Sequence, residues 1–288
     1  RAVEDDFFNQ SIDLLYISPE KLLSTGFLPL LKSAKVNLFA IDEAHCISAW
    51  SLDFRKEYTQ MKFLKKEFKD MPILALTATA DKLTRKDIIQ QLRLKNPKRF
   101  IDSFDRPNLS LEVRPGQKRF EQILAFLKNR PRQSGIIYCL SRKSSEDLAE
   151  KLNRAGFKAR HYHAGMSDRD SSETQEAVIN DNIRIIYANI AFGMGIDKSH
   201  VRWVIHYNMP KNIESYYQEI GRAGRDGAKA DTLLFYSYGD VLILQDIIEQ
   251  NNGGQNDIQL AKLDRIRQYA ESLACRRRIL LNYFSEDL

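Results

Sequence analysis

Short apolar runs recur along this chain of 288 residues, and each is followed by an amphipathic stretch with helical spacing. Several runs are rich in β-branched and aromatic residues without polar alternation, which is typical of strands covered on both faces of a sheet. This rhythm predicts an α/β fold with parallel sheets. The expected strands are residues 14–17, 36–41, 73–76, 135–139, 183–187, 201–207 and 232–236.

One expected helix is marked at both ends. Ser141 can accept a hydrogen bond from the first turn as an N-cap, and Gly156 is typical of the position where a helix stops. Between these two residues one face of the helix is apolar, with Leu148, Leu152 and Ala155.

The length of the chain allows two cores of ordinary domain size. A proline interrupts regular structure at residues 105–108 (Asp-Arg-Pro-Asn), and residues 251–254 (Asn-Asn-Gly-Gly) are prone to form a turn. We therefore predict domains at 1–106, 107–250 and 251–288, the last being the start of a helical unit. Its apolar stripe is Leu263, Ile266, Ala270 and Leu273, and its polar face carries Arg265, Arg267 and residues 276–278.

The composition is that of a globular protein, with 43% hydrophobic and 28% charged residues. The net charge of +6 permits binding to a polyanion but is weak support for it alone. No apolar run reaches the about 18 residues that span a bilayer. The chain opens with neither a start methionine nor a signal peptide, so we expect it to begin in mid-protein, to be cytoplasmic and to have no membrane partner.

The three cysteines lie far apart in the sequence, which excludes a disulfide scaffold and any complete metal site made of cysteines. We expect Cys46 and Cys139 to be small buried hydrophobic residues.

The sharpest local signal is residues 38–45, Leu-Phe-Ala-Ile-Asp-Glu-Ala-His. A buried strand here delivers Asp42 and Glu43 at its carboxyl end, where ligands bind in open α/β sheets. Nucleotide hydrolysis needs one carboxylate for Mg²⁺ and a second group that orients or deprotonates water, so Asp42 suits the first task and Glu43 the second. An isolated Asp-Glu pair would indicate only a solvated strand end, but the setting in Asp-Glu-Ala-His favours function.

A second strand end carries Thr77 and Thr79 in the string Thr-Ala-Thr-Ala. Small hydroxyl residues there can bond a neighbouring acid or histidine and so report the state of a nucleotide, although the same residues could simply cap the next helix.

The second half of the chain supplies basic groups in residues 218–227, Gln-Glu-Ile-Gly-Arg-Ala-Gly-Arg-Asp-Gly. Arg222 and Arg225 are three residues apart at an expected helix end, which would place both guanidinium groups on one face. Arginine suits the charge that develops on a transferred phosphoryl group. The plain alternative is a surface arginine pair before a glycine stop. Upstream, residues 191–198 look like a glycine loop that could approach a nucleotide, with Asp197 expected to bond a hydroxyl, although the two glycines alone would be unremarkable.

Together these strings resemble the RecQ family of helicases, from about Ile12 to the C-terminus. Their order differs from that of RNA helicases of the Asp-Glu-Ala-Asp type, which usually place a histidine where this chain has Gln218. Further strings that carry the resemblance are residues 16–20 (Tyr-Ile-Ser-Pro-Glu), 46–50 (Cys-Ile-Ser-Ala-Trp), 53–55 (Asp-Phe-Arg), 103–108 (Ser-Phe-Asp-Arg-Pro-Asn) and 162–165 (Tyr-His-Ala-Gly).

The resemblance implies an α/β fold of two RecA-like parallel-sheet lobes, the first incomplete, followed by the start of a helical zinc-binding region. The lobes would clamp ATP and walk 3′ to 5′ on single-stranded DNA. The partners would be single-stranded and partly duplex DNA, in recombination and repair, with the protein at the nucleoid if it is bacterial. The oligomeric state stays open, with a monomer expected.

The resemblance also implies roles for individual residues. Asp42 would serve Mg²⁺, Glu43 would activate water, and Arg225 would be the arginine finger. The implied nucleotide contacts are Asp42, Gly195, Asp197, Gln218, Arg222 and Arg225. The implied DNA contacts are Trp50, Phe54, Arg55, Arg106 and His163, although core packing is the alternative for the two aromatic residues. The residues that would couple nucleotide and DNA are His45, Thr77 and Thr79.

Several departures from the family pattern limit what this chain is expected to do alone. No Gly-x-x-x-x-Gly-Lys-Ser/Thr string occurs, so we expect little or no ATPase activity from these residues alone. Cys275 resembles the first of four zinc ligands, and since the other three are missing, no metal is expected here. The resemblance also puts Ser51, Leu52, Asn189 and Ser285 where the family usually has other residues.

Two other functions stay open from the sequence. One is an RNA-directed helicase or remodelling ATPase with the same two-lobe engine. The other is a nucleic-acid-binding remnant without catalysis, which would hold if the natural protein began near Arg1.

Overall fold

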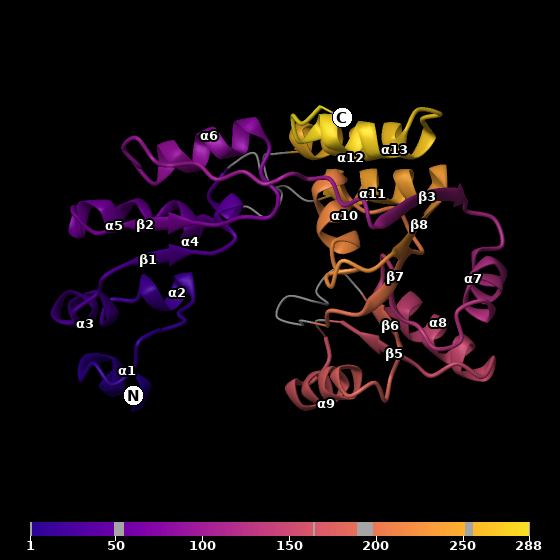
Figure 1. Cartoon of the computed structure of the whole chain (residues 1–288), viewed down its shortest axis with the longest axis horizontal. Helices are drawn as coiled ribbons and strands as arrows, with labels where there is room; N and C mark the ends of the chain where they lie inside the picture. The colour runs from indigo at the N-terminus through magenta and orange to yellow at the C-terminus, as the bar shows by residue number, and fades with distance from the viewer. Residues whose placement is uncertain (1, 49–54, 164, 189–197, 251–255, 288) are drawn as a thin grey trace. The chain divides into compact units, whose positions relative to one another are not determined.

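The computed structural model describes residues 2–48, 55–163, 165–188, 198–250 and 256–287 (Figure 1). It divides into two compact units, Arg1–Asp102 and Ser103–Leu288. The domain limits expected at residues 106 and 250 remain predictions. Among the described residues, no helix is both long and apolar enough to cross a membrane.

The first unit contains two short parallel strands, β1 (Phe39–Ile41) and β2 (Ile73–Ala75), with Phe39 opposite Ile73. Its buried cluster includes Leu31, Ile41, Ile47 and Leu64. Its helical elements are α1 (Ala2–Phe8), α2 (Pro19–Leu22), α3 (Phe27–Ser33), the 3₁₀ helix η1 (Ala44–Ile47), α4 (Lys56–Thr59), α5 (Lys62–Glu67) and α6 (Lys82–Gln91).

The strand expected at residues 14–17 is not formed, and this prediction was wrong. Leu14 is 66% exposed and Tyr16 is 88% exposed, so the run is not buried. In the described part of the unit, neither β1 nor β2 pairs with this segment. A strand depends on a neighbour for its backbone hydrogen bonds, and an apolar run reveals its composition but not its neighbour.

The second unit is built on a parallel sheet with the order β3-β8-β7-β4-β6-β5 (Figure 1). Its strands are β3 (Leu109–Pro115), β4 (Ser134–Tyr138), β5 (Ala159–Tyr162), β6 (Ile185–Ala188), β7 (Val201–His206) and β8 (Ala230–Tyr236). Its helices are α7 (Arg119–Lys128), α8 (Arg142–Arg154), α9 (Asp168–Ile179), α10 (Ile213–Ile220), α11 (Tyr238–Gln250), α12 (Asn256–Glu271) and α13 (Arg276–Tyr283).

The strands expected at 135–139, 183–187, 201–207 and 232–236 are confirmed, within a few residues, as β4, β6, β7 and β8. The strands β3 and β5, which are the two edges of the sheet, were not predicted. An edge strand has one neighbour and is partly exposed, so its residues are not a continuous apolar run. In both missed strands only the first residue is buried, and the others are exposed or half-buried.

Apolar clusters cover both faces of this sheet because alternate residues of a strand point to opposite sides. Ile136 of β4 belongs to the cluster that contains residues of α10 to α13. Its neighbour Ile137 belongs to the cluster with α7 and α8, where Trp203 is fully buried. Cys139 and, in the first unit, Cys46 are buried at 4% exposure, as expected.

The predicted helix after Ser141 is confirmed as α8, except that Ala155, expected on its apolar face, is the exposed C-cap residue. The Ser141 hydroxyl oxygen accepts a hydrogen bond from the Ser144 N–H at 3.1 Å, Leu148 and Leu152 are buried, and Gly156 has a φ of +88°.

The stripe predicted near the C-terminus is confirmed only in part. Leu263, Ile266 and Ala270 are buried on α12, but this helix ends at Glu271 and Leu273 is fully exposed. Residues 276–278 begin α13, so they do not belong to the polar face of α12 as expected.

Candidate functional site

Asp42 and Glu43 follow β1 directly, at the edge of the sheet where β2 also ends. Two further backbone bonds extend the pairing: Leu76 N–H donates to the Ile41 carbonyl at 2.9 Å, and Ala44 N–H donates to the Leu76 carbonyl at 2.8 Å. The Asp42 carboxylate accepts a hydrogen bond from the Glu43 N–H at 2.8 Å. The acidic pair is therefore fixed between two parallel strands at their carboxyl ends.

Glu43 has a left-handed backbone with φ of +48°. This conformation costs a non-glycine residue about 1–3 kcal/mol, and such residues gather at functional sites. Here it turns the chain from β1 into η1.

His45 links the acidic strand end to the threonine string. Its ring is 4% exposed, and its Nδ1 lies 3.0 Å from the Thr77 hydroxyl and 3.2 Å from a Glu43 carboxylate oxygen. The Thr77 hydroxyl also accepts a hydrogen bond from the Thr79 N–H at 3.3 Å. The structure thus brings together Glu43, His45, Thr77 and Thr79, which the sequence could only propose from two separate strings. A proton on His45 Nδ1 can be shared between the Glu43 carboxylate and the Thr77 hydroxyl. A change in the hydrogen bonding of one of these groups therefore alters the hydrogen bond to the other.

Arg55 is exposed, and its backbone N–H donates to the Cys46 carbonyl at 3.0 Å, which ties the segment after residue 54 to η1. Burial raises the pKa of Tyr58, and the Arg55 guanidinium opposes that shift. Trp50 and Phe54 lie outside the described residues, as do Ser51 and Leu52.

Arg222 and Arg225 lie in the turn at residues 221–227. The expectation that both stand on a helix end was wrong, because α10 stops at Ile220 and Gly221 caps it. Gly224 has a φ of +58°, and its N–H donates to the Val201 carbonyl at the start of β7 at 2.9 Å. A bond to the sheet therefore replaces the next helical turn.

Two side chains from the start of the unit hold this arginine turn. The Arg106 guanidinium donates to the carbonyls of Ala223 and Gly224, both at 3.1 Å. The Asn108 amide donates to the carbonyls of Gly224 and Ala228, both at 2.9 Å. A Cβ on Gly224 would lie 2.4 Å from the Asn108 amide nitrogen, so glycine is required for this close approach.

Arg277 on α13 supports the same segment from behind. Its guanidinium donates to the carbonyls of Arg106 at 2.8 Å and of Leu109 at 2.7 Å, and to the Asp105 carboxylate. No positioning role was predicted for Asn108 or Arg277, although Asn108 lies in the string at residues 103–108 and Arg277 in the basic run at residues 276–278. A local sequence pattern cannot reveal that a side chain binds a backbone carbonyl more than 100 positions away.

Arg222 and Arg225 line one pocket together with Arg184 and Lys198. Arg222 also bonds the hydroxyl of Tyr138, whose pKa is raised by burial while the Arg222 charge acts against the rise. Lys198 is paired with Asp181 at 2.7 Å. The excess of positive charge in this pocket favours an anionic group such as a phosphate.

The other expected site residues have varied surroundings. Gln218 lies on α10, while Gly195, Asp197 and Asn189 lie outside the described residues. His163 is buried, and its Nε2 lies 2.9 Å from a Glu146 oxygen. The expected DNA contacts of His163 and Arg106 stay predictions, although Arg106 serves the arginine turn here.

Cys275 is exposed at the N-cap of α13. The backbone N–H groups of Arg278 and Arg277 lower the pKa of its thiol, which favours the thiolate that binds a metal. Its role as a zinc ligand stays a prediction.

Three family models match this chain in succession. They are the DEAD/DEAH box helicase at residues 2–88, the helicase conserved C-terminal domain at 118–227, and RecQ zinc-binding at 238–288.

Curated relatives match almost the whole chain. It is 47% identical over 287 residues to the ATP-dependent DNA helicase RecQ of Pasteurella multocida, covering 99% of this chain and 45% of the relative. It is 40% identical over 275 residues to the ATP-dependent DNA helicase RecQ of Bacillus subtilis, covering 95% and 46%. The chain spans about half the length of these curated relatives.

Solved structures share the fold. Dbp5 of S. cerevisiae bound to RNA and ADP BeF3 matches with a TM-score of 0.60 at 17% identity, over 86% of this chain and 68% of that one. The helicase Lhr of Mycobacterium smegmatis, bound to ssDNA and AMP-PNP, matches with a TM-score of 0.58 at 19% identity, over 91% and 40%. With the family models, these matches confirm the predicted α/β fold with RecA-like helicase lobes.

Proposed function

We propose, because this chain belongs to the RecQ family of helicases, that the protein hydrolyses ATP to move 3′ to 5′ along single-stranded DNA and to unwind duplex DNA. The succession of three family models along the chain supports this function. A role in recombination and repair follows from the family alone.

One observation carries the proposal: His45 Nδ1 lies within 3.2 Å of both a Glu43 carboxylate oxygen and the Thr77 hydroxyl. A general base for water must be held at the strand end and must also be connected to the rest of the protein if hydrolysis is to drive movement. The side-chain contacts from Glu43 through His45 to Thr77 both hold the base and connect it to a second strand end. A solvated acidic strand end would do neither.

We assign the roles of the acidic residues as follows. Asp42 holds Mg²⁺ through the carboxylate, since carboxylate oxygens are the ligands that Mg²⁺ prefers in proteins. Glu43 orients and deprotonates the attacking water. Magnesium bound to the nucleotide would neutralise charge on the phosphates.

Arg222 and Arg225 stabilise charge on the transferred phosphoryl group, with Arg225 as the finger. Their shared positive pocket supports this assignment. Gly195, Asp197 and Gln218 complete the proposed nucleotide contacts.

DNA binding is proposed for Trp50, Phe54, Arg55, Arg106 and His163, with bases stacking on the aromatic rings. Zinc binding is proposed at Cys275 in a protein that supplies three further ligands.

The 288 residues contain no phosphate-binding loop of the Gly-x-x-x-x-Gly-Lys-Ser/Thr type. We therefore expect turnover from a longer natural protein that carries such a loop, and little or none from this chain by itself. The test uses that longer protein and measures ATP turnover with single-stranded DNA, with RNA and with neither.

The decisive variant is Glu43→Gln, which keeps the shape of the side chain and removes the base. We expect strong stimulation by DNA and a fall in turnover of about 10²–10⁴-fold in the variant. Glu150→Gln is the control, because Glu150 is 70% exposed in a surface pair with Arg154. Stimulation by RNA alone would favour an RNA-directed helicase. A lack of turnover under every condition would leave a nucleic-acid-binding protein without catalysis.

A further inference from the structure

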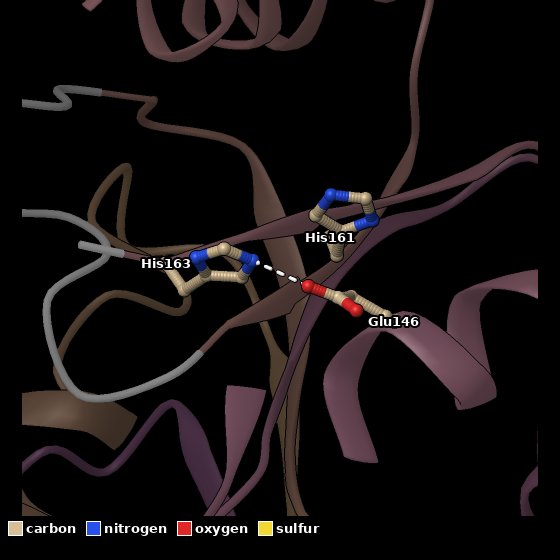
Figure 2. A group of neighbouring side chains, drawn as sticks. All are labelled: Glu146, His161 and His163. Carbon is tan, nitrogen blue, oxygen red and sulfur yellow. Dashed lines mark hydrogen bonds and ion pairs between the residues drawn. The ribbon is translucent and has the colours of Figure 1, made fainter. Parts of the chain in front are cut away.

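Three side chains that can bind a metal meet beside the edge strand of the second unit: Glu146 of α8, His161 of β5, and His163 just beyond β5 (Figure 2). One ligand atom from each lies within 4.8 Å of the other two. The two imidazole rings are stacked with centroids 5.3 Å apart and planes 9° apart. His163 Nε2 lies 2.9 Å from Glu146 Oε1.

The fold itself causes this grouping. His161 and His163 are two residues apart in extended chain, so both side chains point to the same side. That side faces α8, and Asn153 of α8 fixes the distance between helix and strand. Its amide donates to the Ala159 carbonyl, and its carbonyl oxygen accepts from the Ala159 N–H, both at 2.9 Å. The Ser141 cap sets where α8 begins and so where Glu146 lies.

We propose that Glu146, His161 and His163 bind a divalent transition metal, with Zn²⁺ as the ion that fits best. Two imidazoles and one carboxylate form a ligand set that suits zinc and leaves a fourth position for water. Magnesium and calcium prefer all-oxygen sites, so they fit less well. We expected no metal because the zinc site that begins at Cys275 lacks its other three ligands. That expectation does not concern Glu146, His161 and His163, which include no cysteine.

The geometry needs only a small adjustment. Metal bonds of 2.0–2.2 Å place tetrahedral ligand atoms about 3.3 Å apart. The spacing between His163 Nε2 and Glu146 Oε1 is 2.9 Å, and all three ligand atoms lie within 4.8 Å of one another. The Glu146 side chain is 49% exposed and can move, whereas His163 is held at 9% exposure. The two histidine ligands are therefore already in position, and the Glu146 carboxylate would move to complete the site.

A metal ion at His163 would replace the hydrogen bond that this ring makes with Glu146. Nδ1 accepts a hydrogen bond from the Gly165 N–H at 3.2 Å, so the neutral ring carries its proton on Nε2 and donates it to Glu146. To bind zinc through Nε2, the ring would first take the other neutral tautomer: the Nε2 proton passes to water, Nδ1 gains a proton from water, and the Nε2 lone pair becomes available. An Nδ1–H cannot accept from Gly165, so that bond breaks. Metal binding is thus coupled to the hydrogen bond that the Gly165 N–H donates.

Arg142 opposes the ion. A Cβ built on Gly165 would lie 2.6 Å from an Arg142 guanidinium nitrogen and 3.4 Å from His163 Nδ1, which places a positive charge beside the ring. Removing that charge in Arg142→Ala should tighten zinc binding.

The experiment titrates the chain with Zn²⁺ alone against a chromogenic chelator, in a Cys275→Ser background that removes the exposed thiol. We expect one ion per chain. His161→Ala should weaken binding by at least about tenfold, since even residues that only support metal ligands cost about 10–100-fold. His200→Ala is the control, because His200 is 48% exposed and lies beside Asp181, outside this group.

Three further measurements separate a lost ligand from a lost fold. Zinc should raise the thermal unfolding midpoint of the wild type and not that of His161→Ala. Glu146→Gln should weaken binding, and because the Glu146 side chain is 49% exposed, the fold should be kept. ¹⁵N spectra of His163 should show the proton on Nε2 without zinc and on Nδ1 with it. Failure to find saturable binding, or equal affinity in His161→Ala and His200→Ala, would refute the site and leave a hydrogen-bonded pair.

Discussion

The acidic strand end of the first unit and the arginine turn of the second carry opposite charges, and they are held in different ways. At the acidic end, the residues proposed for chemistry bond one another: His45 contacts Glu43 and Thr77, which are 2 and 32 positions away. At the arginine turn, the positioning groups are Arg106 and Asn108, 116 or more positions from the carbonyls they bind.

This difference separates two kinds of positioning. The acidic end is a local device that two neighbouring strands suffice to build. The arginine turn follows α10 and is held by the segment that leads into β3, which is held in turn by the C-terminal helix α13. It therefore forms only when the whole second unit is folded. We therefore expect substitutions at the arginine turn to cost more stability than substitutions at the acidic end.

The largest effect is expected for Gly224→Ala. Its φ of +58° strains any other residue, and the added Cβ would meet the Asn108 amide nitrogen at 2.4 Å and the Ala228 carbonyl at 2.7 Å. We expect the free energy of unfolding of the second unit to fall by about 2–4 kcal/mol. Urea unfolding followed by the fluorescence of the buried Trp203, in a Trp50→Phe background, measures it.

Gly227→Ala is the matched control for that variant. Gly227 has a φ of +79° but nothing within 4 Å of an added Cβ, so only the backbone strain of about 1–2 kcal/mol should appear. Equal losses in the two variants would show that the Asn108 contact does not constrain the turn.

Arg277→Ala is expected to come next. It leaves the carbonyls of Arg106 and Leu109 without this donor and leaves Asp105 without its ion pair. We expect a loss of about 1.5–3 kcal/mol in the same unfolding assay. The neighbouring Arg278 is exposed, and Arg278→Ala should stay within about 0.5 kcal/mol of the wild type. A similar loss in both would argue against long-range positioning by α13.

Thr77→Val tests the local device and should cost less. Valine keeps the shape but removes the hydroxyl that contacts His45, so we expect a loss of about 1 kcal/mol in unfolding of the first unit. The His45 ring signals in NMR spectra should shift at the same time. Thr59→Val is the control, since in the described contacts the Thr59 hydroxyl donates only to the Lys56 carbonyl, one turn earlier in α4. A loss larger than that of Gly224→Ala would reverse the comparison.

The smallest effect is a dependence on pH. Burial, with the Glu271 carboxylate that accepts its hydrogen bond, raises the pKa of Tyr236 from 10.0 to about 12. The folded state therefore holds the phenol proton more tightly than the unfolded state. This contribution is fully present below pH 10 and is lost as the pH rises toward about 12. Tyr236→Phe should flatten the fall in stability across this window; an unchanged slope would contradict the shift.

The sequence predicts the structure best where a pattern is repeated within a few residues. The strands β4, β6, β7 and β8 are buried on both faces, so their runs were continuous and readable. The cap at Ser141 was found because its partner is three residues away. It failed for the edge strands β3 and β5, where exposure interrupts the pattern, and for residues 14–17, where an apolar run pairs with neither β1 nor β2.

Within the candidate site, the sequence could name Glu43, His45 and Thr77 and suggest that a threonine hydroxyl bonds a nearby acid or histidine, but not which side chains meet. It named Arg222 and Arg225 for the wrong geometric reason, since they share a pocket and not a helix face. It missed Asn108 and Arg277 as positioning groups.

The sequence by itself determined the chemical inventory and its order: the acidic pair after a buried strand, the threonine string, the arginine string, and the parallel α/β framework. These follow from local propensity and periodicity, which are properties of neighbouring residues. Only the tertiary structure decided that Arg106, Asn108 and Arg277 hold one turn, and that Glu146 faces His161 and His163. Such groupings depend on which strands are neighbours and on where a helix begins relative to a sheet, and no local pattern encodes those distances.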